Sequence, residues 1–335
     1  MGYDTIKLEK GMYHVTGKSF TQVLESMDPS QNYIGSELEG LDAYQRQLKR
    51  YGIKVSGAGS DAVEKFFSTA DSSALFPEYI SRAVAQGISE ANSLNEIIAT
   101  KTVINGLDYR SITIPADDET QSLKRVAEGA AIPTTTIKKQ EKLVKLVKRG
   151  RMLEASYEAI RFQKLDLFTI ALKQIGAYIA KTQFNDAVGV LLNGDGNNNA
   201  AGAVAVTTSG SFGYADLVKL WSELGDFKMN AIVADSGAMG KILNLSEVKD
   251  AVAGLNFHAT GKLVTPLGAN LVKSTVLPEN TLLALDKTCA LEMVCAGDVM
   301  VEYDKLIDRQ LERAAITSIA GFSKIFADAV LKMSV

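Results

Sequence analysis

Residues that build most catalytic and metal sites are scarce in this 335-residue sequence, which has 2 histidines and 2 cysteines. Nucleophilic and acid–base catalysis most often recruits histidine, and neither His14 nor His258 stands beside a nucleophile motif. Cys289 and Cys295 match no metal-binding or redox spacing, so we interpret them as small core residues of a protein made in a reducing cytosol. The sequence therefore predicts no catalytic residue, no metal and no cofactor.

The sequence also lacks a charge excess and a long apolar run. Its 36 basic and 39 acidic residues give a net charge of −3, without the basic footprint of a protein that binds nucleic acid tightly. No apolar stretch reaches the ~18 residues of a membrane-spanning helix. Residues 1–7 lack the apolar core of a signal peptide. We expect a soluble, intracellularly made protein of mixed α and β structure, with no membrane partner.

Two glycine-rich motifs resemble nucleotide-binding loops but lack the surroundings that such loops need. Residues 57–62 match the dinucleotide fingerprint, yet the preceding residues 53–55 are too short for the required strand. Residues 237–241 have two residues between their glycines where a phosphate loop has four, and Ile242 replaces the magnesium-binding hydroxyl. We interpret the first motif as a hinge and reject the second.

The most informative segment is a long, sparsely charged helical run from about Lys164 to Leu192. Only five of its residues are charged, and its apolar residues lie all around the helix instead of along one stripe. Such a helix is buried on most sides, and at 1.5 Å per residue it is roughly 40 Å long. An ordinary domain does not cover a helix of that length on several faces. Other subunits are the most direct source of neighbours, so the pattern predicts an assembly protein.

A polar turn follows this helix at residues 193–199. Its aspartate and asparagines alternate like the oxygen ligands of a calcium loop, but Ala200 replaces the required glycine and Val206 replaces the closing glutamate. Glycine, asparagine and aspartate tolerate left-handed backbone angles. We therefore interpret the segment as a turn that does not bind calcium.

The first ~70 residues are polar, contain only short apolar pieces and cannot build a core alone. Ser36 and Glu39 form a capping-box pattern that predicts a helix from there to Gly52. Apolar residues recur along that helix at helical spacing: Leu38, Leu41, Tyr44, Leu48 and Tyr51. We interpret the region as an extended arm that lays one amphipathic helix on another surface. Deletion of residues 1–50 should then leave a folded subunit.

From Leu75 the sequence is typical of a globular domain, with a helix predicted over residues 79–98 and a β-type run ending at Ile114. Residues 115–151 are polar and have no core of their own, so we interpret them as a protruding loop. Leu143 to Val147 fit a helical period better than strand alternation. The basic residues from Lys138 to Arg151 have no interleaved aromatics for base stacking. That favours a solvated or partner-facing charge run over a nucleic-acid site.

After Gly202 the pattern alternates between helices and strands. It predicts helices over residues 214–225 and 236–245, and strands at residues 231–234 and 282–285 with shorter strand-like pieces at 263–264 and 271–272. Three further strands are predicted at residues 300–303, 316–326 and 329–333. This block is typical of a small α/β domain inserted before the C-terminal strands.

The order of these elements resembles the major capsid proteins of tailed bacteriophages with the Hong Kong 97-type fold. Three segments carry the resemblance: Ala127 to Pro133, Arg151 to Glu158, and Leu191 to Gly196. They correspond to the family's extended-loop tip, returning strand and spine-helix exit. The resemblance covers most of the sequence from Leu75 to Val335.

The resemblance implies an α+β fold with five parts. These are an N-terminal arm (1–74), a peripheral domain (75–114, 150–202 and 299–335) with a spine helix at about 164–192, an extended β-loop (115–149) and an inserted axial domain (203–298). It also implies strand instead of helix around Leu143.

The resemblance further implies a structural major capsid protein that is not an enzyme. Such proteins self-assemble through hexamers and pentamers into an icosahedral head that encloses double-stranded DNA, here a virion assembled in the cytoplasm of a bacterial host. Expected partners are other copies, scaffolding and portal proteins, and packaged DNA through weak, non-specific contact with the inner surface. The hypothesis places assembly contacts at Leu41, Tyr44, Leu48, Lys138, Lys139, Lys142, Lys145, Lys148 and Arg149.

Two other hypotheses compete with this one. An encapsulin-type nanocompartment shell shares the fold and encloses cargo enzymes, but such shells usually begin with a short helix where this protein has a long polar segment. A nucleotide-dependent enzyme using the loop at Gly57 belongs to a different class, and ligand-induced thermal stabilisation by NAD or ATP would distinguish it.

Overall fold

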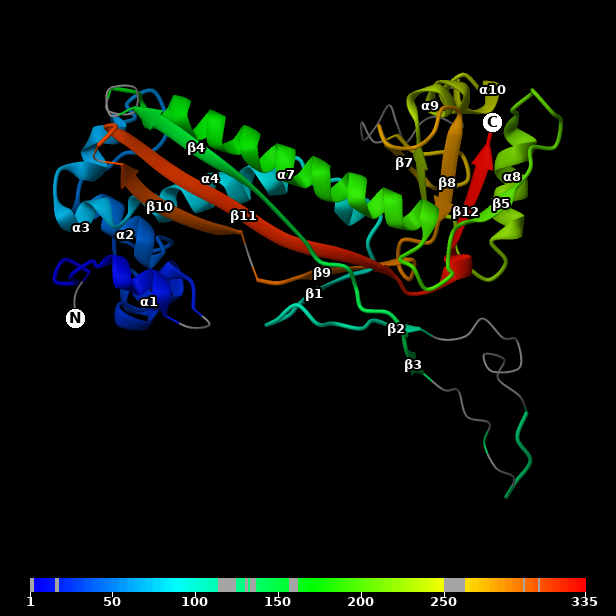
Figure 1. Ribbon diagram of the computed structural model, residues 1–335, viewed down its shortest axis with the longest axis horizontal. Coiled ribbons are helices and arrows are strands. Elements are labelled where there is room, and N and C mark those ends of the chain that lie inside the picture. The colour runs from blue at the N-terminus through cyan, green and yellow to red at the C-terminus, as the bar shows by residue number, and fades with distance from the viewer. Residues whose placement is uncertain are drawn as a thin grey trace. The chain divides into compact units, whose positions relative to one another are not determined.

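Two structural units are each built from three separate stretches of the protein in the computed structural model (Figure 1). Unit 1 comprises Met1–Ala91, Arg149–Ile179 and Val299–Ser318, and unit 2 comprises Asn92–Lys148, Ala180–Asp298 and Ile319–Val335. The structure describes residues 3–15, 18–113, 125–129, 132, 137–156, 162–249, 263–297, 299–306 and 308–335. His258 and part of the predicted loop tip lie outside the described residues.

The N-terminal part of unit 1 is a series of short helices. The α-helices are α1 (Phe20–Met27), α2 (Ala43–Arg50), α3 (Ala70–Ser73) and α4 (Phe76–Glu90), with 3-10 turns at Lys10–His14, Ser30–Tyr33 and Val63–Phe67. The predicted start of α2 is wrong. Asp42 and Gln45 form its capping box, because Ser36 and Glu39 instead bond to backbone groups of the preceding loop.

Residues of this N-terminal segment share one hydrophobic core with the rest of unit 1. Phe20, Leu24, Tyr44 and Leu48 lie in the same buried cluster as residues of α4. Full burial of one such side chain contributes about 1.5–3 kcal/mol. The expectation of an extended arm is therefore corrected, since each short helix is too small for a core but several helices pool their apolar faces. Deleting residues 1–50 would remove part of the core of unit 1.

Helix α7 (Leu165–Asn193) matches the predicted spine helix to within one residue at each end (Figure 1). Its first half packs against α4 at two glycines. A Cβ on Gly176 would lie 2.2 Å from the Val84 carbonyl oxygen, and one on Gly87 would lie 2.1 Å from the Lys173 carbonyl oxygen. The two helix backbones are therefore in direct contact, which any side chain at these positions would prevent.

Three strands complete unit 1. β10 (Met300–Leu306) and the first part of β11 (Leu311–Lys324) form an antiparallel pair whose register runs from Met300↔Thr317 to Leu306↔Leu311. β4 (Val147–Ser156) pairs with β11. The predicted strands at residues 300–303 and 316–326 are thus confirmed, with β11 extending further toward the N-terminus.

Unit 2 contains a five-stranded sheet in the order β5-β12-β8-β6-β7. Its strands are β5 (Gly202–Val204), β6 (Ala231–Ala234), β7 (Asn270–Lys273), β8 (Thr281–Leu285) and β12 (Val330–Ser334). Alternate residues of β6 enter two different hydrophobic clusters, so the strand is buried on both faces and is one continuous apolar run. Helices α8 (Tyr214–Glu223), α9 (Ser236–Leu243) and α10 (Ser246–Lys249) accompany the sheet. The helices predicted after residues 213 and 235 are confirmed.

The remaining strands of unit 2 are β1, β2, β3 and β9. β1 (Thr100–Val103) runs parallel to β9 (Leu291–Cys295), which pairs antiparallel with the end of β11, while β2 (Ile112–Thr113) pairs with β3 (Lys138–Lys139). The helix that periodicity predicts at Leu143 is wrong, because residues 143–146 form no helix and β4 begins at Val147. The strand that the resemblance implies at Leu143 is also absent, because residues 143–146 are irregular and strand begins only at Val147.

Candidate functional site

A network of polar side chains joins the turn after α7 to the returning limb of the loop. Asp195 accepts hydrogen bonds from the Ser323 hydroxyl at 2.9 Å and the Lys324 amide at 3.0 Å. Gln140, buried at the loop base, accepts from Ser323 at 2.8 Å and from the Asn197 amide group at 3.1 Å. Its own amide group donates to the Lys324 carbonyl at 2.6 Å. These bonds fix the position of the loop relative to β11.

The turn itself has the backbone that the sequence predicts. Gly194, Gly196 and Asn198 have φ angles of 82°, 97° and 59°, which places all three in the left-handed region. Burial raises the pKa of Asp195, but hydrogen bonds from Ser323 and Asn197 outweigh that effect and hold the pKa below its ordinary value. The carboxylate is therefore ionised at neutral pH and serves as an anchor.

A second carboxylate anchors the outgoing limb of the loop. Glu292 on β9 is buried and accepts hydrogen bonds from the hydroxyls of Thr102, Tyr109 and Ser111. The Thr102 and Tyr109 bonds measure 2.5 and 2.8 Å. Burial and the Glu292 carboxylate raise the pKa of Tyr109 above its ordinary value. The outgoing limb of the loop is thus held by the buried Glu292. The returning limb is held by Gln140, whose partners Ser323 and Asn197 also bond to the half-buried Asp195. Sequence reasoning missed Gln140 and Glu292.

Lys324 is a buried cation beside this network. Its side chain is 1% exposed, and its Nζ has no hydrogen-bond partner among the described residues. Burial lowers the pKa of Lys324 to about 8, against the attraction of Asp195 and Asp328. An unfolded lysine titrates near 10.5, so the folded protein binds fewer protons between pH 8 and 10.5. The free energy of unfolding should therefore rise with pH across that window.

Replacing Lys324 with methionine is expected to stabilise unit 2 at pH 7, because the substitution removes a buried charge and keeps the side-chain length. It should also reduce the rise of the unfolding free energy between pH 8 and 10.5. The measurement is urea unfolding at pH 7 and pH 10, followed by the single tryptophan, Trp221 of α8. Lys273→Met, at the exposed end of β7, is the matched control. It should change neither the stability at pH 7 nor the dependence of stability on pH. A Lys324→Met variant that is less stable at pH 7 would contradict the expectation.

The predicted basic residues of the loop lie on its exposed side. Lys138, Lys139, Lys142, Lys145 and Lys148 are all exposed, as is Arg149. Gln140 and Val144 between them are buried, and their amides donate to the carbonyls of Ser111 and Tyr109 at 2.9 Å each. We call residues 137–148 the basic strip.

The three residues predicted on the N-terminal helix have different surroundings. Tyr44 and Leu48 are 2% and 7% exposed, with their side chains inside the core of unit 1, and Leu41 is half-buried. Tyr44 and Leu48 are therefore core residues of the subunit, and the hypothesis that they contact other subunits is corrected. Their helical spacing indicated a buried face without indicating what buries it.

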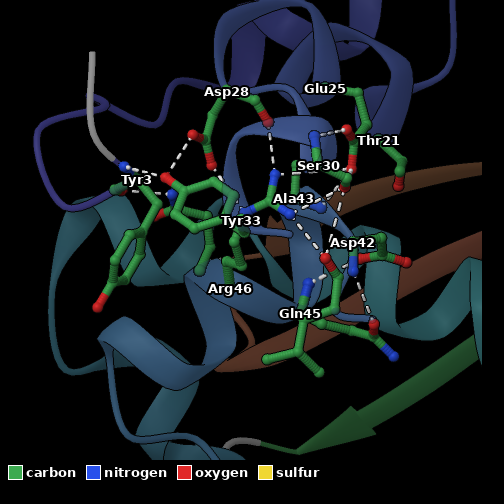
Figure 2. A network of polar contacts seen from close by, with 12 residues as sticks. Tyr3, Thr21, Glu25, Asp28, Ser30, Tyr33, Asp42, Ala43, Gln45 and Arg46 are labelled. Carbon is green, nitrogen blue, oxygen red and sulfur yellow. Dashed lines mark hydrogen bonds and ion pairs between the residues drawn. The ribbon is translucent and has the colours of Figure 1, made fainter. Parts of the chain in front are cut away.

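A buried arginine organises the loop before α2 (Figure 2). The Arg46 guanidinium, 0% exposed, donates to the Asp28 carboxylate at 2.8 Å, the Ser30 hydroxyl at 2.9 Å and the Leu41 carbonyl at 2.6 Å. It also stacks over the Tyr33 ring at 4.4 Å, and the Tyr33 hydroxyl donates to Asp28 at 2.6 Å. Both ends of the loop at residues 29–41 are thereby fixed to one side chain.

Large apolar side chains remain exposed along the first half of α7. Leu167, Ile170 and Tyr178 are 59%, 62% and 55% exposed and lie on one face of the helix, and Phe162 just before it is 74% exposed. We call these four residues the α7 patch. The sequence pattern, apolar all around the helix, indicated uncovered sides but not which residues form them.

Neither glycine-rich motif has the geometry of a nucleotide-binding loop. Gly57 lies in a turn preceded by no strand and followed by a 3-10 turn. At the start of α9 the Asp235 carboxylate accepts from the Gly237 and Ala238 amides at 2.9 Å, where a phosphate would have to bind. Within the described parts of the protein, no group of histidine, cysteine, aspartate and glutamate side chains has the arrangement of a metal site. No described helix is long and apolar enough to cross a membrane.

Comparison with known proteins gives one family and a shared fold. The sequence profile of a family described as "Phage capsid protein" matches residues 139–320. Similar solved structures include a virus-like particle from Pyrococcus furiosus (TM-score 0.53, 13% identity, covering 76% of this sequence and 98% of the other). The capsid of a native GTA particle gives a TM-score of 0.54 at 15% identity, over 72% of this sequence and 89% of the other. The capsid of an empty GTA particle gives 0.52 at 17% identity over the same shares. No curated protein matches the sequence.

Proposed function

This protein belongs to the phage capsid protein family, and on that premise we propose that it is the major capsid protein of a tailed bacteriophage. Its copies assemble through hexamers and pentamers into an icosahedral head that encloses double-stranded DNA. The protein acts through self-association and has no catalytic chemistry. Scaffolding and portal proteins are its partners during assembly in the bacterial cytoplasm.

The observation that carries this proposal is the α7 patch. Its four residues lie within the segment that the family profile matches. Large apolar side chains clustered on a protein surface mark an interaction site, and in a capsid protein the neighbouring surface belongs to other copies. Some apolar side chains of the long helix are thus buried inside the subunit, and others are buried between subunits.

The family architecture also supports a division of labour within the subunit. We propose that residues 75–114, 150–202 and 299–335 form the peripheral domain, residues 203–298 the axial domain and residues 115–149 the extended loop. Two carboxylates at the loop base, the half-buried Asp195 and the buried Glu292, support the last assignment because their hydrogen-bond networks fix the base of the loop.

Electron microscopy of the purified protein at increasing concentration tests the proposal. We expect shells, tubes or capsomers. A protein that sediments strictly as a monomer at high concentration would contradict it.

The contents of purified particles distinguish the alternative, an encapsulin-type shell. The likeness to a virus-like particle supports a common fold and does not choose between the two functions. Particles isolated from cells should contain DNA if the protein builds a phage head, whereas a cargo protein without DNA would favour the nanocompartment.

A further inference from the structure

A loop with two exposed glutamates joins the first two α-helices of unit 1. In residues 31–40, which we call the acidic loop, nearly every side chain is exposed, including Glu37, Glu39 and Ile34, the last at 73%. The loop has internal bonds: Glu39 accepts from the Gly35 amide at 2.8 Å, and the Ser36 hydroxyl donates to the Tyr33 carbonyl at 2.7 Å. An exposed isoleucine is thus presented on an ordered backbone and flanked by negative charge.

Hydrogen bonds from buried and half-buried polar groups fix the two ends of this loop. Arg46 fixes its two ends through Asp28 and the Leu41 carbonyl (Figure 2). Glu25 adds bonds to the Ser30 amide at 2.9 Å and the Ala43 amide at 2.6 Å. Burying a charged guanidinium costs free energy that apolar packing would not. In return, these bonds stabilise the shape of a loop whose own tip contributes nothing to the core.

The basic strip has complementary properties. Five exposed lysines and Glu141 give residues 137–148 a net positive charge, and the exposed Ile137 and Leu143, at 60% and 46%, interleave apolar contact area. The strip is also held in place, because the backbone amides of Gln140 and Val144 donate to the carbonyls of Ser111 and Tyr109. Both surfaces are therefore ordered, exposed and of opposite charge, and each has apolar residues among its charges.

We propose that the basic strip of one copy binds the acidic loop of a neighbouring copy. Ile34 packs against the apolar side chains of the strip, while Glu37 and Glu39 pair with its lysines. Electrostatic complementarity of this kind steers association and fixes the register of two surfaces. The inference rests on the proposed self-assembly and adds the pair of surfaces that meet.

Two charge-reversed variants test the pairing. The strip variant carries Lys142→Glu, Lys145→Glu and Lys148→Glu, which makes the basic strip negative. The loop variant carries Glu37→Lys and Asn32→Lys, which makes the acidic loop positive and leaves Glu39 to hold Gly35. Each variant alone then opposes like charges, so its assembly at low salt should require at least about tenfold more protein than the wild type. An equimolar mixture should assemble, because the negative strip of one variant fits the positive loop of the other, and the two unaltered surfaces still fit each other.

Sedimentation and electron microscopy of the strip variant, the loop variant and their mixture give the readout, with urea unfolding to show that each protein is folded. A triple reversal at exposed lysines elsewhere, Lys49→Glu, Lys228→Glu and Lys249→Glu, is the matched control and should assemble like the wild type. Recovery in the mixture supports the pairing. A mixture that stays unassembled, an unaffected loop variant, or a defect of the strip variant confined to DNA binding would overturn it. Failure of the wild type to assemble would overturn the proposed function as well, so the two failures are distinguishable.

Discussion

Replacing Arg46 with alanine is expected to destabilise unit 1 by about 3–5 kcal/mol, because it leaves the Asp28 carboxylate buried without its cation. The substitution also removes the donors that Ser30 and the Leu41 carbonyl use, so the acidic loop loses its fixed ends. Hydrogen exchange at the amides of α1 and α2 is the appropriate measurement, since the single tryptophan lies in unit 2 and does not report on this region. Faster exchange across both helices is the expected result.

Two further variants separate charge from geometry in this experiment. Arg46→Lys keeps a cation beside Asp28 but cannot reproduce the paired donors of the guanidinium group. Its hydrogen-exchange rates should therefore lie between those of the wild type and of Arg46→Ala. Arg309→Ala removes an exposed arginine whose pair with Asp308 spans 3.8 Å, and it should change stability by less than about 0.5 kcal/mol. Equal effects of Arg46→Ala and Arg309→Ala would show that burial of the ion pair does not matter.

The N-terminal segment shows why sequence patterns misplace such structures. The spacing of Tyr44 and Leu48 correctly indicated a buried helical face, and Gly52 ended the helix as expected, with a φ of 62°. Patterns cannot reveal that several short helices share one core, because the contacts join residues far apart in the sequence. The burial of Arg46 was equally unpredictable, because a single arginine in a polar stretch is typical of a surface residue until its partners are known.

The long helix and the strands of unit 2 were predictable for the opposite reason. α7 has 29 residues, and β6 is an unbroken apolar run, so local pattern and final structure agree. The loop base was not predictable, since Gln140, Asp195 and Glu292 come from three distant segments. The helix prediction for residues 143–147 was wrong because adjacent apolar pairs fit a helical period over so short a stretch.

Triple replacement of Phe162, Leu167 and Ile170 with glutamine is expected to weaken assembly strongly while leaving the subunit folded. These side chains are 59% to 74% exposed, so their loss should alter the stability of the isolated subunit by no more than about 0.5 kcal/mol each. Covering each in an interface contributes roughly 1 kcal/mol, given about 1.5–3 kcal/mol for full burial. Because every ~1.4 kcal/mol changes an equilibrium tenfold, the three together should raise the protein concentration needed for assembly about a hundredfold.

The matched control for the α7 patch places the same number of glutamines at exposed polar positions of the same region. Lys164→Gln, Asp166→Gln and Lys181→Gln remove no apolar area and should assemble like the wild type. Sedimentation against concentration distinguishes the two proteins, and because the patch acts through apolar burial its defect should persist at high salt. The strip reversal, by contrast, acts through charge and should be strongest at low salt. A patch variant that assembles normally would mean that this face of α7 stays open to solvent in the shell, and the observation that carries the proposed function would lose its force.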